Sequence, residues 1–85
     1  MNDDIRRKVY VQVEAIFTPE GYLIPKTIML DDGRQFLIDK IVDIRRAASR
    51  RPGLPPLQYT CKIWGQNCSL FYEDNNRWFT VLRAS

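Results

Sequence analysis

The sequence predicts an all-β domain, a small antiparallel meander of about six strands that closes or half-closes into an SH3-like barrel. Apolar and polar residues alternate with a period of two along most of the chain, which is the pattern of half-buried strands. Turn-forming residues separate these segments, as they do in hairpins. The 85 residues have room for a single small domain, and a flat sheet of this size would leave one face uncovered and both edges open. Closure into a barrel removes both problems.

Three strands are predicted in the first half of the chain, over residues 8–17, 22–30 and 34–44. They follow a polar N-terminal tail over residues 1–7. Pro25 lies inside the second strand and cannot donate to a ladder, so we expect a sheet edge or a bulge there. Residues 31–33 (Asp-Asp-Gly) predict the hairpin turn into the third strand. The alternation of that strand breaks at Ile41 and Val42, which indicates a bulge or a sharp bend.

A segment over residues 45–56 then interrupts the alternation with three prolines and one glycine. We predict an exposed, flexible basic loop that divides the barrel into two halves of about three strands each. Three further strands are predicted over residues 57–64, 68–73 and 77–83, with turns at residues 66–67 and 74–76.

The two cysteines lie on the fourth and fifth predicted strands. With the hairpin turn at residues 66–67, Cys68 lies opposite Gly65, roughly 13 Å along the strand from Cys61. The Cα atoms of a disulfide are about 4.4–6.8 Å apart, and a register shifted by one residue still leaves about 10 Å and opposite faces. A zinc site would need further ligands of the usual type, which the spacing does not supply. We therefore interpret both cysteines as small core or hairpin residues.

Enzyme activity is not predicted. The sequence contains no histidine, which removes the commonest general base and the commonest metal ligand. The glycines are isolated at turns, so no phosphate-binding loop is present. Asp39 and Asp43 would share a face of a regular third strand, either as a weak divalent-cation site or as a solvated rim beside Lys40 and Arg45. The second interpretation is favoured, so we predict no cofactor and no metal site.

The net charge of +3 comes from one part of the chain. Residues 44–72 contain five basic side chains and no acidic one, whereas residues 1–43 carry a net charge of −2 and residues 73–85 are balanced. Guanidinium groups bind phosphates bidentately, and Trp64 on the polar face beside Lys62 is typical of a base-stacking platform. The predicted nucleic-acid-binding residues are Arg45, Arg46, Arg50, Arg51, Lys62 and Trp64.

The favoured interpretation is a non-enzymatic accessory module that contacts nucleic acid through this basic loop and its aromatic neighbours. A first alternative is a solvated loop with structural aromatics, in which Trp64 covers Gly65 or a neighbouring strand and Trp78 plugs an open end of the barrel. A second alternative is a protein–protein interaction or structural module, which uses a sheet edge exposed near Pro25 or near the bend at Ile41. We expect a monomer or a weak homodimer.

The N-terminal residues are charged, and no apolar run of about 18 residues occurs in the chain. The sequence therefore predicts neither a signal peptide nor a transmembrane helix. The expected location is a reducing cytoplasm of bacterial type.

A pattern of turn and core residues extends over most of the chain, from residue 9 to residue 79. It comprises a hairpin with Gly33 and Arg34, a long strand, a variable basic insertion, a strand that begins at Tyr59, and a terminal strand with Trp78. In this pattern the chain resembles a family of small uncharacterised bacterial β-barrel proteins. It is also similar to a domain of unknown function found beside genes for bacterial error-prone DNA polymerases. The resemblance implies no catalytic residue and favours a role in DNA transactions.

Overall fold

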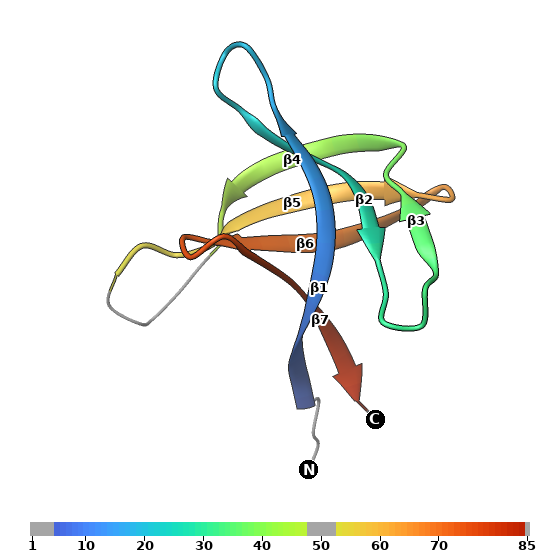
Figure 1. Ribbon diagram of the computed structural model, residues 1–85. Helices are drawn as coiled ribbons and strands as arrows, with labels where there is room; N and C mark the ends of the chain where they lie inside the picture. The colour runs from blue at the N-terminus through green and yellow to red at the C-terminus, as the bar shows by residue number, and fades with distance from the viewer. Residues whose placement is uncertain (1–4, 48–52, 85) are drawn as a thin grey trace.

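The computed structural model describes residues 5–47 and 53–84, which form seven strands and no helix (Figure 1). The strands are β1 (Ile5–Phe17), β2 (Leu23–Met29), β3 (Gln35–Leu37), β4 (Lys40–Arg46), β5 (Leu57–Ile63), β6 (Gln66–Glu73) and β7 (Arg77–Ala84). In these two ranges, no helix has the length and apolar character that crossing a membrane requires. All ladders are antiparallel, so the predicted all-β class is confirmed, with seven strands in place of about six.

The strands form one sheet in the order β3-β2-β1-β7-β6-β5-β4, which curls into a half-barrel. The long strand β1 belongs to two ladders, because its residues 5–11 pair with β7 and its residues 12–17 pair with β2. In Figure 1, β1 and β2 accordingly run at a steep angle to β4, β5 and β6. The end strands β3 and β4 are consecutive in the chain. In the bend between them, the Ile38 amide donates to a β2 carbonyl at 2.9 Å and the Asp39 amide to a β5 carbonyl at 2.8 Å.

This bend divides the predicted third strand into β3 and β4. The predicted irregularity at Ile41 and Val42 is confirmed as a bulge, since the ladder with β5 shifts register between Ile41 and Asp43. Near the N-terminus, β1 begins at Ile5, so the last residues of the predicted N-terminal tail belong to a strand.

The boundary between β4 and the basic loop also differs from the prediction. β4 continues to Arg46, because Arg45 pairs with Gln58 and the Ala47 amide donates to the Pro56 carbonyl at 2.9 Å. Proline lacks an N–H but its carbonyl still accepts, so Pro56 ends the ladder without breaking it. The prediction that Arg45 and Arg46 lie in a loop is therefore wrong.

The predicted irregularity at Pro25 is a bulge in β2. The ladder with β1 shifts from the pair Glu14 and Thr27 to the pair Ala15 and Pro25, which leaves Lys26 as the extra residue. β3 pairs with β2 only at residues 27–29, so the ladder partner of Pro25 among the described residues is β1 alone. The side chain of Pro25 is buried.

β5 and β6 form a hairpin whose turn consists of Trp64 and Gly65, with φ of 52° and 77°. Two successive residues with positive φ are the signature of a type I′ turn. In the resulting register Cys61 lies directly opposite Cys68. The predicted turn at residues 66–67 is wrong, and with it the separation of roughly 13 Å between the cysteines. The prediction failed because it gave the positive-φ positions to residues after Gly65.

The hydrophobic core lies on the inner face of the half-barrel and centres on four buried side chains: Tyr59, Cys61, Leu70 and Trp78. The Tyr59 hydroxyl donates to the Leu23 carbonyl at 2.6 Å and so joins β5 to β2. Trp78 is 8% exposed, with its ring 5.4 Å from that of Tyr59 and 4.7 Å from that of Tyr72. Trp78 is therefore a structural residue of the core.

A second aromatic cluster covers the outer face at the centre of the sheet. Phe79 is 4% exposed, and its ring stacks on that of Phe71 with 4.9 Å between centroids. The Lys8 ammonium lies 4.7 Å from the centre of the Phe79 ring. The Glu73 carboxylate accepts from Lys8 at 2.9 Å and from the Tyr10 hydroxyl at 3.1 Å. This cluster ties β1, β6 and β7 together across the outer face.

Candidate interaction site

The structure separates the predicted nucleic-acid-binding residues into two groups. Arg45 and Arg46 lie at the end of β4, whereas Trp64 lies in the turn at the other end of β5. The β5 residue opposite Arg45 is six positions before Trp64, which corresponds to about 20 Å of strand. Arg50 and Arg51 lie outside the described residues. The described part of this site is therefore not one constellation.

At the arginine end, both guanidinium groups already have partners. Arg45 Nε lies 2.6 Å from the Asp43 carboxylate, and Arg46 Nη1 donates to the Pro55 carbonyl at 2.8 Å. Arg46 is also 4.0 Å from the carboxylate of Asp74, in the turn between β6 and β7. Exposed pairs of this kind are weak and exchange readily with a competing anion. The end of β4 is therefore basic but partly neutralised.

At the other end, Trp64 is 79% exposed and packs edge-on against Phe36 with ring centroids 5.7 Å apart. Its amide donates to the Asp39 carboxylate at 3.1 Å, which anchors the turn to the bend between β3 and β4. Lys62 and Lys40 are cross-strand partners one residue pair away from this turn. An exposed indole and two lysines thus lie at one corner of the sheet.

The two aspartates of the predicted third strand, Asp39 and Asp43, have separate partners in the structure. Asp39 accepts from the Trp64 amide and Asp43 pairs with Arg45. The bulge at Val42 breaks the regular alternation that a shared face would require. Across residues 5–47 and 53–84, no three His, Cys, Asp or Glu side chains come close enough together to hold a metal ion.

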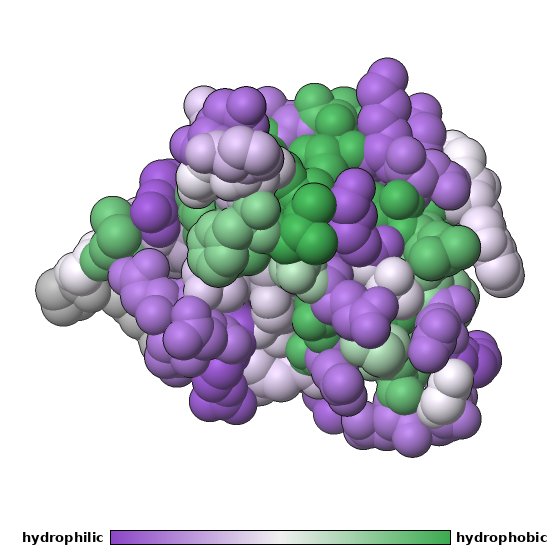
Figure 2. All heavy atoms as spheres, turned by 45° about the horizontal axis from the view of Figure 1, so that its top comes forward, coloured by the Kyte–Doolittle hydropathy of each residue, from purple (hydrophilic) through white to green (hydrophobic). Residues whose placement is uncertain are grey.

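β4 is an end strand of the sheet and carries a long free edge. Within the described part of the chain it pairs with β5 alone. Val42 and Ile44 on this strand are 47% and 40% exposed. Figure 2 turns the top of Figure 1 toward the viewer and shows apolar side chains at the surface between polar ones. The sequence predicts an exposed edge near the bend at Ile41, but the predicted strand ends at Ile44, two residues too early.

The backbone groups of β4 alternate in direction. Ala47 donates to Pro56 and so points toward β5. In an antiparallel ladder, successive residues point their N–H and C=O groups alternately toward and away from one partner. Arg46 and Ile44 therefore direct their backbone donors and acceptors to the free side. The free edge thus presents backbone donors and acceptors at two residues, one with an apolar side chain (Ile44) and one with a cationic side chain (Arg46).

An apolar cavity of about 380 Å³ lies between the β5–β6 hairpin and strands β1 to β3. Its floor includes the buried side chains of Cys61 and Leu70, and its rim includes the exposed side chains of Trp64 and Cys68. β6 and β7 pair only between residues 71–73 and 77–79, so the first half of β6 borders this cavity with β5 as its ladder partner.

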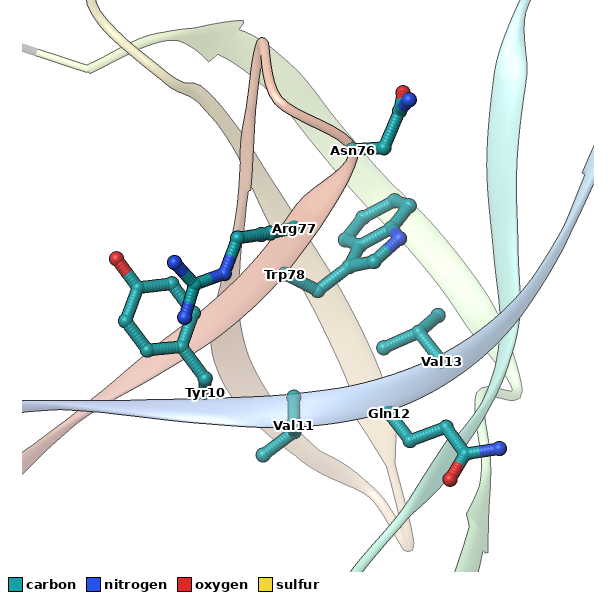
Figure 3. A pocket seen from close by; sticks show the side chains of 7 residues that line it. All are labelled: Tyr10, Val11, Gln12, Val13, Asn76, Arg77 and Trp78. Atoms are coloured by element: carbon teal, nitrogen blue, oxygen red, sulfur yellow. The ribbon is translucent and has the colours of Figure 1, made fainter.

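A second pocket of about 290 Å³ opens where β1 changes partner from β7 to β2 (Figure 3). Residues 10–13 and 76–78 line it, and Trp78 points toward Val13 across it. The Arg77 guanidinium lies 3.8 Å from the centre of the Tyr10 ring, so its charge is held at the side of the pocket by a cation–π contact.

No protein-family model, no curated protein and no solved structure matches this chain. The resemblance to small bacterial β-barrel proteins therefore stays a prediction.

Proposed function

We propose that this protein is a non-enzymatic binding module that adds an extended, acidic segment of a partner protein to the free edge of β4. The observation that carries this proposal is that β4 is a seven-residue end strand, paired with β5 alone among the described residues. A long unpaired edge presents a row of donors and acceptors to another chain, and strand addition is a common mode of peptide recognition. The exposed side chains of Val42 and Ile44 would contact apolar side chains of the added strand.

The charge of β4 supports an acidic partner. The strand carries Lys40, Arg45 and Arg46 against one acidic residue, Asp43. A second copy of this chain would bring cationic strands side by side, and like charges in facing positions destabilise a ladder. The carboxylates of an acidic strand from another protein would instead attract the cations of β4. An acidic partner is therefore favoured over a homodimer.

The proposal is tested with a short synthetic peptide of alternating valine and glutamate, titrated into isotopically labelled protein. We expect amide shifts concentrated in β4, and weaker binding at high salt because the contacts are partly ionic. Ile44→Pro removes a backbone donor that points to the free side, so it should weaken binding at least tenfold without breaking the ladder to β5. Ile44→Val is the matched control, because it keeps both the donor and an apolar side chain.

Three results would reject strand addition at β4. The first is an absence of shifts at millimolar peptide. The second is equal binding of a peptide in which lysine replaces glutamate, and the third is undiminished binding by Ile44→Pro. Circular dichroism and the backbone spectrum of the free variant establish that the proline has left the fold intact.

Nucleic-acid contact is the second candidate, and the 79% exposure of Trp64, in the turn that follows Lys62 along the chain, favours it. On this proposal Trp64 stacks on a base while Lys62 and the arginines Arg45, Arg46, Arg50 and Arg51 contact phosphates. Single- and double-stranded oligonucleotides at low salt should then change tryptophan fluorescence, and Trp64→Ala should abolish the change. Replacing the four arginines should reduce the salt dependence by about 0.7–0.9 in log–log slope for each phosphate that is no longer bound. Unchanged fluorescence and backbone shifts reject this candidate.

The finer description of the half-barrel as SH3-like belongs to the same proposal. A first strand shared by two ladders, and end strands joined by a short bend, support closure of that type.

A further inference from the structure

Cys61 and Cys68 face each other across the β5–β6 ladder. In a hairpin with a two-residue turn, the residues that flank the turn exchange both hydrogen bonds, and hydrogen-bonded pairs then recur at every second position. Counting from Ile63 and Gln66, the cysteines form the next hydrogen-bonded pair, with a Cα separation of about 5.5 Å. This value lies within the range of about 4.4–6.8 Å found for disulfides. Because directly opposed residues share a face of the sheet, both thiols lie on the cavity side.

The two thiols differ in their access to solvent. Cys61 is fully buried, with its sulfur 3.9 Å from the Tyr59 carbonyl oxygen. Burial, with a smaller contribution from Cys68, raises the pKa of the Cys61 thiol to about 11, so it is protonated at neutral pH. Cys68 is exposed at the rim of the cavity. A reagent from solvent therefore meets Cys68 first, and Cys61 is within reach of whatever forms there.

The ladder leaves room for the sulfurs to approach. Facing Cβ atoms in an antiparallel pair are about 4.5–5.5 Å apart, whereas a disulfide needs about 3.5–4.5 Å. β6 pairs with β7 over residues 71–73, and at Cys68 its described ladder partner is β5 alone. On the β7 side the Thr80 hydroxyl donates to the Ser69 carbonyl at 3.2 Å. The two Cβ atoms must approach by about 1–2 Å, because hydrogen-bonded pairs have the wider separation, and a strand with one ladder partner can shift by this distance more readily than a strand with two.

We propose that Cys61 and Cys68 are a dithiol site for small-molecule disulfides. The Cys68 thiolate attacks one sulfur of the small disulfide, the S–S bond breaks, and one half leaves as a thiol that carries the proton lost by Cys68. The Cys61 thiol then loses its proton, and its sulfur attacks the Cys68 sulfur of the mixed disulfide. The second half leaves as a thiol, and a Cys61–Cys68 disulfide remains. Two protein thiols are oxidised and one disulfide reagent is reduced. This inference is independent of the function proposed for β4.

The test is incubation of the fully reduced protein with oxidised glutathione, followed by acid quenching, alkylation of free thiols and intact-mass analysis. We expect a transient glutathione adduct on Cys68, followed by a product that has lost two hydrogens, carries no adduct and resists alkylation. Peptide mapping should locate the new bond between residues 61 and 68. In Cys61→Ala, the adduct on Cys68 should form and persist at least tenfold longer than in the parent protein. Cys68→Ser is expected to stay unmodified over the same period.

Three outcomes overturn the proposal in the parent protein alone, so it stays falsifiable even where Cys61→Ala fails to fold. The first is a glutathione adduct that persists without loss of two hydrogens. The second is a protein in which both thiols remain free at a glutathione concentration that modifies an unfolded control of the same chain. The third is an oxidised product that appears only as a linked pair of chains, because the proposed bond lies within one hairpin.

Discussion

The two end strands of the sheet, β3 and β4, manage their free edges differently. β3 has three residues and β4 has seven. Leu37 on β3 is 67% exposed, more than either Val42 or Ile44 on β4, so exposed apolar surface does not distinguish the two edges. Strand length does, because a very short strand offers too few backbone groups to hold another chain. The comparison indicates that β4 is the edge suited to strand addition, whereas β3 is too short to pair stably with another chain.

The two edges nevertheless belong to one short stretch of chain and depend on one core. In the bend that joins β3 to β4, the amide of Ile38 donates to β2 and the amide of Asp39 donates to β5. We can therefore perturb the core that both edges share, then one end of the sheet at a time, and ask how far the edges behave independently.

Trp78→Ala is expected to have the largest effect, a decrease of about 3–5 kcal/mol in the free energy of unfolding. The indole contacts the rings of Tyr59 and Tyr72 beneath the sheet, so its removal should lower hydrogen-exchange protection in β3 and β4 together. Urea denaturation and amide exchange measure the two effects. Val81→Ala, at a side chain 36% exposed on β7, is the control and should cost under about 1 kcal/mol. Reduced protection at one edge alone would contradict a shared core.

Gly65→Ala and Gly21→Ala form a matched pair that separates the ends of the sheet. Both glycines have positive φ, of 77° and 93°, and an added Cβ at either would meet no atom within 4 Å. Each substitution should therefore cost roughly 1–2 kcal/mol through backbone conformation alone. Amide exchange should accelerate in β4 to β6 for Gly65→Ala and in β1 and β2 for Gly21→Ala. Identical exchange patterns for the two variants would mean that the ends do not open separately.

Tyr59→Phe removes the hydrogen bond that joins the two ends across the core. The Tyr59 hydroxyl donates to the Leu23 carbonyl at 2.6 Å, so its removal should cost about 1 kcal/mol and loosen the start of β2. Tyr72→Phe is the control, because the Tyr72 hydroxyl bonds to Asn76 within the turn between β6 and β7. Thermal unfolding and amide exchange at the start of β2 compare the two. Equal loosening of β2 by both variants would show that the Tyr59 bond is not a link between the ends.

Glu73→Gln should have the smallest effect and should not distinguish the edges. The hydrogen bond from Lys8 holds the pKa of the Glu73 carboxyl below its usual value of 4.5. The carboxylate therefore stabilises the fold at pH values above 4.5, and this contribution is lost as the pH falls through the lower pKa of the folded state. At pH 7 the substitution should cost under about 1 kcal/mol, as for other partly exposed pairs. Denaturation at pH 7 and pH 3 measures the difference, which should shrink at the lower pH.

The strand class and several irregularities could be predicted because they depend on local chemistry. Period-two alternation indicates a half-buried strand whatever its partner, and Pro25 requires a bulge or an edge because it has no N–H. The break at Ile41 and Val42 could be predicted because it interrupts the period-two alternation. The place of Arg45 and Arg46 in a strand could not be predicted, because the prolines that follow them are typical of a loop. Only the folded structure shows that the Ala47 amide donates to the Pro56 carbonyl and extends the ladder past both arginines.

The all-β class, the segments that form most of the strands and the lack of histidine chemistry all follow from the amino-acid sequence. The pairing register does not, because it depends on contacts between distant parts of the chain. Turns at residues 64–65 and at residues 66–67 are both compatible with the local sequence. Asp39, which is distant in the chain, favours the turn at residues 64–65 because its carboxylate accepts a hydrogen bond from the Trp64 amide. A different choice of turn re-pairs every residue of the hairpin. Long-range contacts therefore place Cys61 opposite Cys68 and turn the backbone groups of β4 to the free side of the sheet.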